Sequence, residues 1–396
     1  MMFFPYINQE ILMKNRFLFY KTIRSPGGFY PVRVFLFVLF ILNTNIVAQS
    51  YSLKGQMWGS LLRGDDPPAG RSNYEENWGY IPTISYKKNL ANNSLIDLEW
   101  AYKLGKVYAG DYNIGKLDAP YRLWFRYSSD RIEARLGLQK ISFGPAMILR
   151  SLSWFDTIDV KDPTGQTDAV EAFRLRIFPS NSIGLWLWSI NNDQDTLSFG
   201  GRTELSLNAG ELGFTYHSDQ STLSQNIGQS PVYISSAHQR IAFDYRYDGY
   251  IGFWMETAGI LSNSKDNIQS NRFTLFTVGA DYTIPIGPGV LVMVENMNIR
   301  EFSTVTDSTN THNYTAFMAS LPVNMLVQLM FITQVDWDNN NVYNFLRCGI
   351  TYDRFSVNLI LSSSPKRSDY DIAEEYLPKT TSGFGTGVQF MLVYNH

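Results

Sequence analysis

The sequence has little of the chemistry that builds disulfide, metal or catalytic centres. Cys348 is the only cysteine among the 396 residues, so neither an internal disulfide nor a cysteine-based zinc site can form. The four histidines, His217, His238, His312 and His396, are far apart and show no metal-ligand spacing. No phosphate-binding glycine loop appears either. We therefore expect no metal and no cofactor.

Charged residues and long apolar runs are also scarce. Charged residues make up 17% of the chain, against about a quarter in ordinary soluble proteins. The formal net charge of −3 gives no argument for a nucleic-acid partner. Mean hydropathy is −0.17, and the repeated apolar segments of about 20 residues that a helical membrane protein needs are missing.

Aromatic residues, in contrast, are abundant. The 26 Phe, 24 Tyr and 9 Trp make up 15% of the chain, which excludes disorder because so many aromatic side chains would not stay unburied. Many aromatics with few charges and moderate hydropathy are typical of a transmembrane β-barrel. In such a barrel, alternate strand residues face lipid and the lumen, so the average hydropathy cancels.

The N-terminal segment has the pattern of a secretory signal peptide. Residues 34–42 are continuously apolar, Arg33 precedes them, and a small-residue region follows at 45–50. Nine apolar residues are too few to span a bilayer as a helix. We expect residues 1–49 to be a leader, with Met13 as an alternative start, and residues 50–396 to form one barrel domain. An uncleaved anchor is the other interpretation.

From residue 50 onward, apolar and polar residues alternate with period two, as in half-buried strands. Short connections with turn residues lie near 88–92, 128–131, 179–182, 208–211, 247–250, 284–289, 321–325 and 352–354. Longer, mostly polar connections lie near 64–77, 105–117, 144–168, 191–200, 218–237, 263–270, 301–312, 338–341 and 363–381. Eight turns and nine loops join eighteen strands, an even number as in bacterial single-chain barrels.

This rhythm predicts an all-β fold, a transmembrane antiparallel barrel of 16–18 strands with short periplasmic turns and longer extracellular loops. The last strand places Val388, Phe390, Leu392 and Tyr394 on one face, as in the final strand that barrel-insertion machinery reads. A secreted β-sandwich or propeller is the competing fold. The aromatic-rich apolar faces and the lack of a blade repeat favour a barrel in the outer membrane of a Gram-negative bacterium.

Alternation also predicts a basic wall in the lumen. On three strands adjacent in sequence, six arginines fall on the face opposite the apolar one. They are Arg122, Arg126, Arg131, Arg135, Arg174 and Arg176. A charge facing lipid at the midplane costs about 2–4 kcal/mol, so we assign these arginines to the lumen and Tyr121 to the lipid face. The wall would attract anions. Alternatively, Asp97, Glu99 and Glu133 would neutralise it through ion pairs.

The connection at 144–168 is rich in apolar residues that an outer loop does not need, among them Trp154. We expect it to fold into the lumen and narrow the channel, because apolar side chains must be buried. Its constriction residues would be Arg150 and Trp154, with acidic groups facing the arginine wall. Those acidic groups are Asp156, Asp159, Asp162 and Asp168. A surface cap over the barrel mouth is the alternative.

The hairpin at 135–144 and the following loop, Trp154-Phe155-Asp156 to Asp162-Pro163, resemble a pattern in porin-like outer-membrane barrels of Bacteroidota. They are broadly similar to alginate-export-type barrels of eighteen strands. The resemblance covers residues 135–168, and it implies a channel for an anionic solute or polysaccharide. The matching positions are Arg135, Gln139, Gly144 and Asp156, without assigned roles.

Taken together, the sequence predicts a passive channel for small solutes, expected to be anionic, or for oligosaccharides. A polysaccharide-export or scaffold barrel is the alternative. The expected partners are outer-membrane lipid and the insertion machinery, and assembly of several copies is left open. An enzyme is not expected, because His217, Ser218 and Asp219 are adjacent on one strand and cannot face each other. Arg63-Gly64-Asp65 is too short a motif to predict an adhesin.

Overall fold

The computed structural model describes residues 49–192, 196–223, 225–228, 232–262, 271–303, 308–370 and 374–396. The expected leader, up to residue 48, and the predicted loop at 263–270 lie outside this range. No helix in the described part of the chain is long and apolar enough to cross a membrane.

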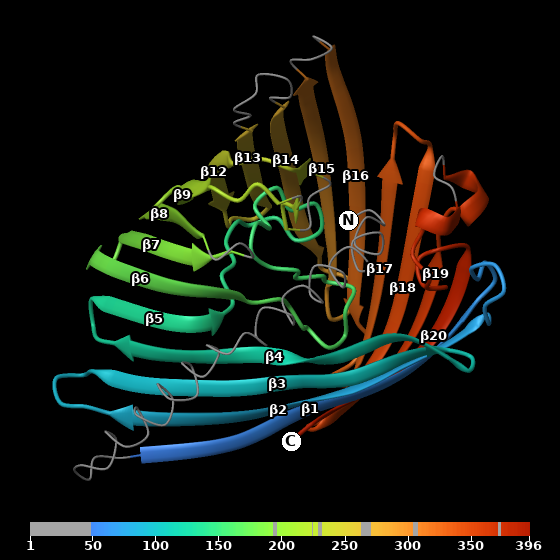
Figure 1. Ribbon diagram of the computed structural model, residues 1–396, viewed down its shortest axis with the longest axis horizontal. Coiled ribbons are helices and arrows are strands. Elements are labelled where there is room, and N and C mark those ends of the chain that lie inside the picture. The colour runs from blue at the N-terminus through green and yellow to red at the C-terminus, as the bar shows by residue number, and fades with distance from the viewer. Residues whose placement is uncertain are drawn as a thin grey trace.

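Eighteen antiparallel strands form one closed sheet (Figure 1). Its strands are β1 (Gln49–Gly64), β2 (Tyr74–Asn89), β3 (Leu95–Ala109), β4 (Tyr112–Ser128), β5 (Ile132–Gln139), β6 (Val170–Ser180), β7 (Ile183–Asn191), β8 (Leu197–Leu207), β9 (Gly210–Asp219), β12 (His238–Tyr247), β13 (Gly252–Ser262), β14 (Asn271–Ile284), β15 (Val290–Ser303), β16 (Ser308–Pro322), β17 (Val327–Asp336), β18 (Asn341–Thr351), β19 (Phe355–Ser363) and β20 (Thr386–Asn395). β10 (Gln225–Asn226) and β11 (Tyr233–Ile234) form a separate small hairpin, and η1 (Arg367–Asp369) and η2 (Glu374–Tyr376) are 3₁₀ turns.

Each barrel strand pairs with its neighbours in chain order, and β1 pairs with both β2 and β20 to close the barrel. Burial alternates along the strands. On β13, Trp254 and Glu256 are buried, whereas Phe253 is exposed. Large apolar side chains stand on the outer face of strands around the barrel, for example Leu136, Phe199, Ile241, Phe276, Phe317 and Phe390. A closed barrel with an apolar outer belt is an outer-membrane barrel, so the predicted fold and location are confirmed.

The predicted short turns are confirmed as well. The predicted outer loop at 301–312 is shorter than expected, because β15 continues to Ser303 and β16 begins at Ser308, and another predicted outer loop is wrong. Residues 105–117 are not a loop, because β3 and β4 continue through them. A two-residue turn joins these strands, and Gly110 adopts a positive φ of 59° there. The polar residues of this segment therefore lie on paired strands and do not mark the end of pairing.

A β-bulge on β4 reverses the predicted direction of one side chain. Ala101 pairs with Arg122 and Tyr102 pairs with Pro120, so Tyr121 is the extra residue. Its hydroxyl accepts a hydrogen bond from the backbone N–H of Thr167 at 3.2 Å. Tyr121 therefore lies inside the barrel and not on the lipid face, because the bulge shifts the alternation by one residue.

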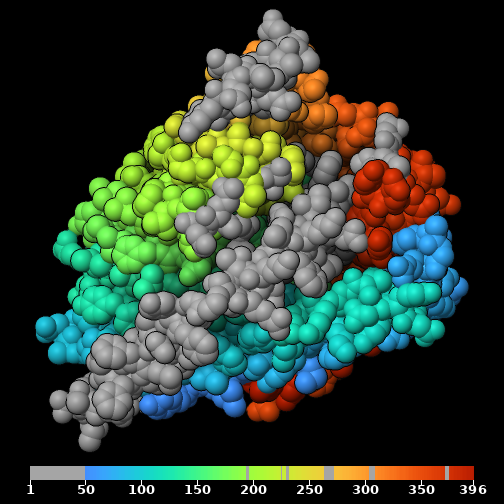
Figure 2. Space-filling view, viewed as in Figure 1, coloured from blue at the N-terminus to red at the C-terminus, as the bar shows by residue number. Residues whose placement is uncertain are grey.

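The loop between β19 and β20 covers the seam of the barrel and lies beside the loop between β1 and β2, as the red and blue surfaces in Figure 2 show. Arg367 is buried here. Its backbone N–H donates to Asp66 at 2.6 Å, one guanidinium nitrogen donates to the carbonyl of Pro378 at 2.9 Å, and its guanidinium lies 3.9 Å from the Phe384 ring centroid. The first and last strands are thus joined on the outer side as well as through their hydrogen bonds.

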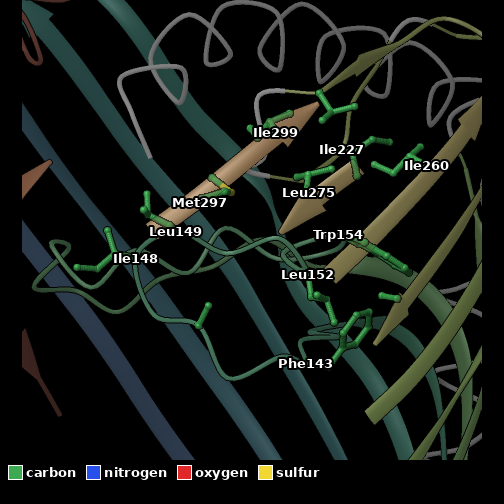
Figure 3. Packing of buried hydrophobic residues seen from close by; sticks show 14 of the residues in the cluster. Phe143, Ile148, Leu149, Leu152, Trp154, Ile227, Ile260, Leu275, Met297 and Ile299 are labelled. Carbon is green, nitrogen blue, oxygen red and sulfur yellow. The ribbon is translucent and has the colours of Figure 1, made fainter. Parts of the chain in front are cut away.

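The lumen contains a hydrophobic core that the alternation did not predict (Figure 3). The inner face of β13 to β17 is largely apolar, although inner faces were expected to be polar. Its buried residues include Ile260, Leu275, Met297, Ile299 and Ile332. Residues 140–169, the connection between β5 and β6, pack against this face. Ile227, Val232 and Ile234 of the next long connection join the same core.

Candidate channel and constriction loop

We use the name constriction loop for residues 140–169. β5 is only 8 residues long, so the chain leaves the wall partway up the barrel. The loop contacts β13 to β15 and also reaches β1, where Gln56 donates to the carbonyl of Thr164 at 3.0 Å. It returns to β4 at Thr167. The loop therefore crosses the lumen and touches several parts of the wall.

Two wall carboxylates hold the first half of the loop. Glu295 on β15 accepts hydrogen bonds from the backbone N–H groups of Met147 at 2.7 Å, Ile148 at 2.9 Å and Leu149 at 2.6 Å. Trp254 also donates its indole N–H to Glu295, at 3.1 Å. These charge-assisted bonds satisfy backbone groups that would otherwise be buried without partners.

Glu256 on β13 does the same for neighbouring loop residues. It accepts from the backbone N–H groups of Ala146 at 2.9 Å and Leu152 at 3.1 Å. Glu256 and Glu295 are both fully buried. The prediction placed acidic groups on the loop and basic groups on the wall. Here the acidic groups are on the wall, and they bind backbone N–H groups of the loop.

The acidic residues of the loop mostly find partners within the loop. Asp156 forms a buried ion pair with Arg150, so it does not face the arginine wall as predicted. Asp159 accepts from the backbone N–H of Lys161 at 2.9 Å, and Asp162 accepts from that of Thr164 at 2.8 Å. Donors two residues ahead are available locally, which is why these carboxylates form tight turns of their own.

Burial changes the pKa values of two charged side chains in the loop. It raises the pKa of Asp162, because the charged carboxylate loses water. Burial alone would lower the pKa of the Arg150 guanidinium, but the hydrogen bond and charge of Asp156 outweigh it and the pKa is raised. Arg150 is therefore held as a cation beside Asp156.

Trp154 is buried at the centre of the loop core. Its indole N–H donates to the carbonyl of Ser151 at 3.2 Å. The ring meets Phe143 edge-on with 5.6 Å between centroids, and the Arg240 guanidinium lies 5.7 Å from it. Trp154 thus links the loop to β12 and shapes the loop from within.

Three of the six predicted arginines form a row across neighbouring strands. Arg126 on β4 is the cross-strand partner of Arg135 on β5, which is the partner of Arg174 on β6. We call these three residues the arginine row. Glu133 lies 2.7 Å from Arg174, 3.4 Å from Arg126 and 3.6 Å from Arg135, and Asp97 lies 2.5 Å from Arg126. One carboxylate therefore serves all three guanidinium groups.

Arg176 lies beside the row and stacks on Trp186, 4.1 Å from the ring centroid. Its nearest ion pair is with Glu204 at 4.0 Å. Arg202 on β8, which the sequence analysis did not single out, binds Glu204 at 2.9 Å and Asp244 at 2.6 Å. This part of the wall is balanced in charge.

The remaining two predicted arginines lie elsewhere. Arg122 donates to the carbonyl of Thr167 at 2.8 Å and to that of Tyr121 at 2.6 Å, so it fixes the end of the constriction loop. Arg131 is exposed in the turn before β5 and donates to the carbonyl of Pro179 at 2.9 Å. Its assignment to the wall was wrong, because Arg131 lies in the turn and β5 begins at Ile132.

The arginine row lies on the periplasmic side of the constriction loop. β5 starts at Ile132 beside a short turn, passes through Arg135, and enters the loop after Gln139. A solute entering from outside would therefore pass the loop before it meets the row.

Glu256 and Glu295 were not among the predicted site residues. Both stand on inner faces that are otherwise apolar, as with Ala258 and Ile260 beyond Glu256. A lone carboxylate in an apolar row needs a partner, which is the signal that could have identified them. In the part of the chain that the structure describes, no group of three or more His, Cys, Asp or Glu residues is placed to hold a metal ion.

The closed barrel resembles outer-membrane porins of known structure. It is similar to a BenF-like porin from Pseudomonas fluorescens Pf-5, with a TM-score of 0.58 and 10% identity over 88% of this chain and 98% of that one. It is also similar to OccK5 (OpdH) of Pseudomonas aeruginosa, with a TM-score of 0.53 and 8% identity over 87% and 98% of the chains.

A third similar structure is OmpT, an outer membrane protein of Vibrio cholerae, with a TM-score of 0.52 and 9% identity over 88% and 100% of the chains. At these identities the likeness establishes the fold. No protein-family model and no curated protein sequence matches the chain.

Proposed function

We propose that the barrel is an outer-membrane channel for passive diffusion of small solutes, with a preference for anions, anionic saccharides included. The observation that carries the proposal is the shared use of Glu133 by the arginine row. The three guanidinium groups form ion pairs with only two carboxylates, Glu133 and Asp97, so the ion-paired cluster has one more guanidinium than carboxylate. Glu99, the third predicted partner, accepts the indole N–H of Trp124 at 3.2 Å. A net charge on a narrow wall lowers the barrier for solutes of opposite sign.

Among the three arginines, Arg135 has the weakest ion pair with a carboxylate. Its 3.6 Å contact with Glu133 is the longest of the three, and Arg174 binds the same carboxylate oxygen at 2.7 Å. The guanidinium of Arg135 lies 4.5 Å from the Trp124 ring centroid, which holds it along the wall. Arg135 is thus the main anion-attracting group of the proposal.

The constriction loop supplies the narrow part of the channel. In this proposal Arg150, Trp154 and Asp156 set its shape from inside the loop, while Asp159 and Asp162 are half-buried on it. The loop, and not the wall alone, would then limit the size of the solute.

A polysaccharide-export or scaffold barrel is the second candidate. It is favoured by the core that the constriction loop shares with Ile227 and Ile234 of a second long connection, because two packed segments in the lumen suit a gated or closed barrel. Residues 135–168 resemble part of the alginate-export-type barrels of Bacteroidota. This resemblance remains a prediction, and it agrees with the second candidate.

The proposal is tested with the reversal potential of single channels under a KCl gradient. Arg135→Ala should reduce the preference for chloride, and Glu133→Gln should increase it, because the two changes remove charges of opposite sign. Arg246→Ala is the matched control, since Arg246 is exposed and pairs with Asp248 next to a turn. Unchanged selectivity in both wall variants would assign the arginine row to internal ion pairing alone.

A further inference from the structure

The eight short turns fall into two groups that occupy opposite halves of the barrel. The four turns between β2 and β9, at 90–94, 129–131, 181–182 and 208–209, carry Asn, Ser and Asp residues. The four between β12 and β19, at 248–251, 285–289, 323–326 and 352–354, expose apolar or aromatic residues. Met325 is 96% exposed, Tyr250 84% and Ile286 65%. Such residues are unusual at turn tips that meet only water.

These apolar turns are continuous with the lipid-facing belt. The Tyr250 ring lies 5.2 Å from that of Tyr282, on the outer face of β14, and their hydroxyl oxygens are 2.7 Å apart. In another of these turns, Tyr352 lies 4.8 Å from Phe355, which is exposed at the start of β19. Tyrosines at this position are typical of the boundary between lipid and water.

At the extracellular edge of the belt, the outer apolar run differs in length between β15 and β3. On β15 the outer face is apolar from Val290 to Val294, and the next outer residue, Asn296, is exposed and donates to Thr315 at 3.0 Å. On β3, in the other half, the outer apolar run extends from Ile96 to Leu104. The outer apolar run on β15 therefore ends nearer its periplasmic turn than the run on β3, whereas on β14 and β18 it extends to Phe276 and Val342.

We infer that the barrel sits obliquely in the membrane, and that the turns between β12 and β19 contact phospholipid at the headgroup and upper acyl level of the periplasmic leaflet. The turns of the other half stand in periplasmic water. Lipid is the partner because the apolar turns extend a surface that already faces lipid. This inference rests on the membrane location and does not depend on which solute passes.

Spin labels at single cysteines test this placement. In a Cys348→Ser background, Met325→Cys and Tyr250→Cys are labelled in the apolar turns, and Asn208→Cys and Asn181→Cys are the controls in polar turns. The refolded barrels are placed in phosphatidylethanolamine and phosphatidylglycerol vesicles. Collisions of each label with oxygen, which concentrates in lipid, are compared with collisions with a water-soluble nickel chelate.

The expected result is a label at position 325 or 250 with at least a several-fold higher ratio of oxygen to nickel collisions than one at 208 or 181. Equal ratios at all four positions would overturn the inference. A label at 325 that neither reagent reaches would also overturn it, since it would indicate contact with protein.

Asn296→Cys and Leu104→Cys check the extracellular edge of the belt, where the label at 104 should lie in lipid and that at 296 in water. Heat modifiability confirms that each variant is folded.

Discussion

The carboxylate of Glu295 on β15 accepts the backbone N–H of Leu149 in the constriction loop at 2.6 Å, and this contact fixes a loop that starts on a distant part of the wall. The loop backbone carries the donors and the barrel carries the negative charge. This arrangement holds the loop through its backbone, in addition to the packing of its side chains, and it places the narrow part of the channel under the control of β13 and β15.

Replacement of Glu295 should loosen the loop. In Glu295→Ala the N–H groups of Met147, Ile148 and Leu149 lose their acceptor, and each buried donor left unpaired costs about 1–3 kcal/mol. We expect larger current fluctuations in single-channel recordings of a barrel that still folds. Glu76→Ala, at an exposed position, is the control, and recordings as quiet as the parent's would argue against the anchor.

Removal of the loop centre tests its place in the channel. Deletion of residues 150–162 should increase the single-channel conductance, because the segment crosses the lumen between β15 and β1. The measurement is the conductance of the refolded deletion variant in a planar bilayer. A conductance equal to that of the parent would place the segment outside the ion path.

Removal of one partner of the Arg150–Asp156 pair should destabilise the constriction loop more than removal of both partners. Asp156→Ala leaves a buried guanidinium uncompensated, which typically costs about 3–5 kcal/mol. The double variant Arg150→Met with Asp156→Leu should cost much less, since no charge remains buried. Protease sensitivity of the loop in folded barrels reports the difference, and equal sensitivity of the two variants would contradict it.

A glycine controls the position of Trp254, the indole that binds Glu295. A side-chain carbon added at Gly279 would overlap the Trp254 ring, whereas one added at Gly59 would meet no atom within 4 Å. Gly279→Ala should therefore destabilise the barrel by about 1–3 kcal/mol and disturb the loop anchor. Gly59→Ala is the matched control in urea unfolding. Similar unfolding midpoints would show that the ring has room to move.

The strand count and the turns could be predicted because period-two alternation and turn residues are local signals. The inward turn of Tyr121 could not, since a bulge adds one residue without changing composition. The lone carboxylate of Glu295 in an apolar row signals a buried partner, but the sequence does not show that the partners are backbone N–H groups of the loop. Asp156 was assigned to the wrong partner because a nearby cation, Arg150, is reached at a lower entropic cost than a distant wall.

The central claim is that the barrel conducts small solutes and favours anions. It is tested most directly by the single-channel conductance of refolded residues 50–396 in a planar bilayer, with the reversal potential under a KCl gradient. The account predicts a stable conductance with a reversal potential that indicates a preference for chloride over potassium. This preference should be smaller in Arg135→Ala. A folded, heat-modifiable barrel that passes no current, or one that prefers potassium, would contradict it.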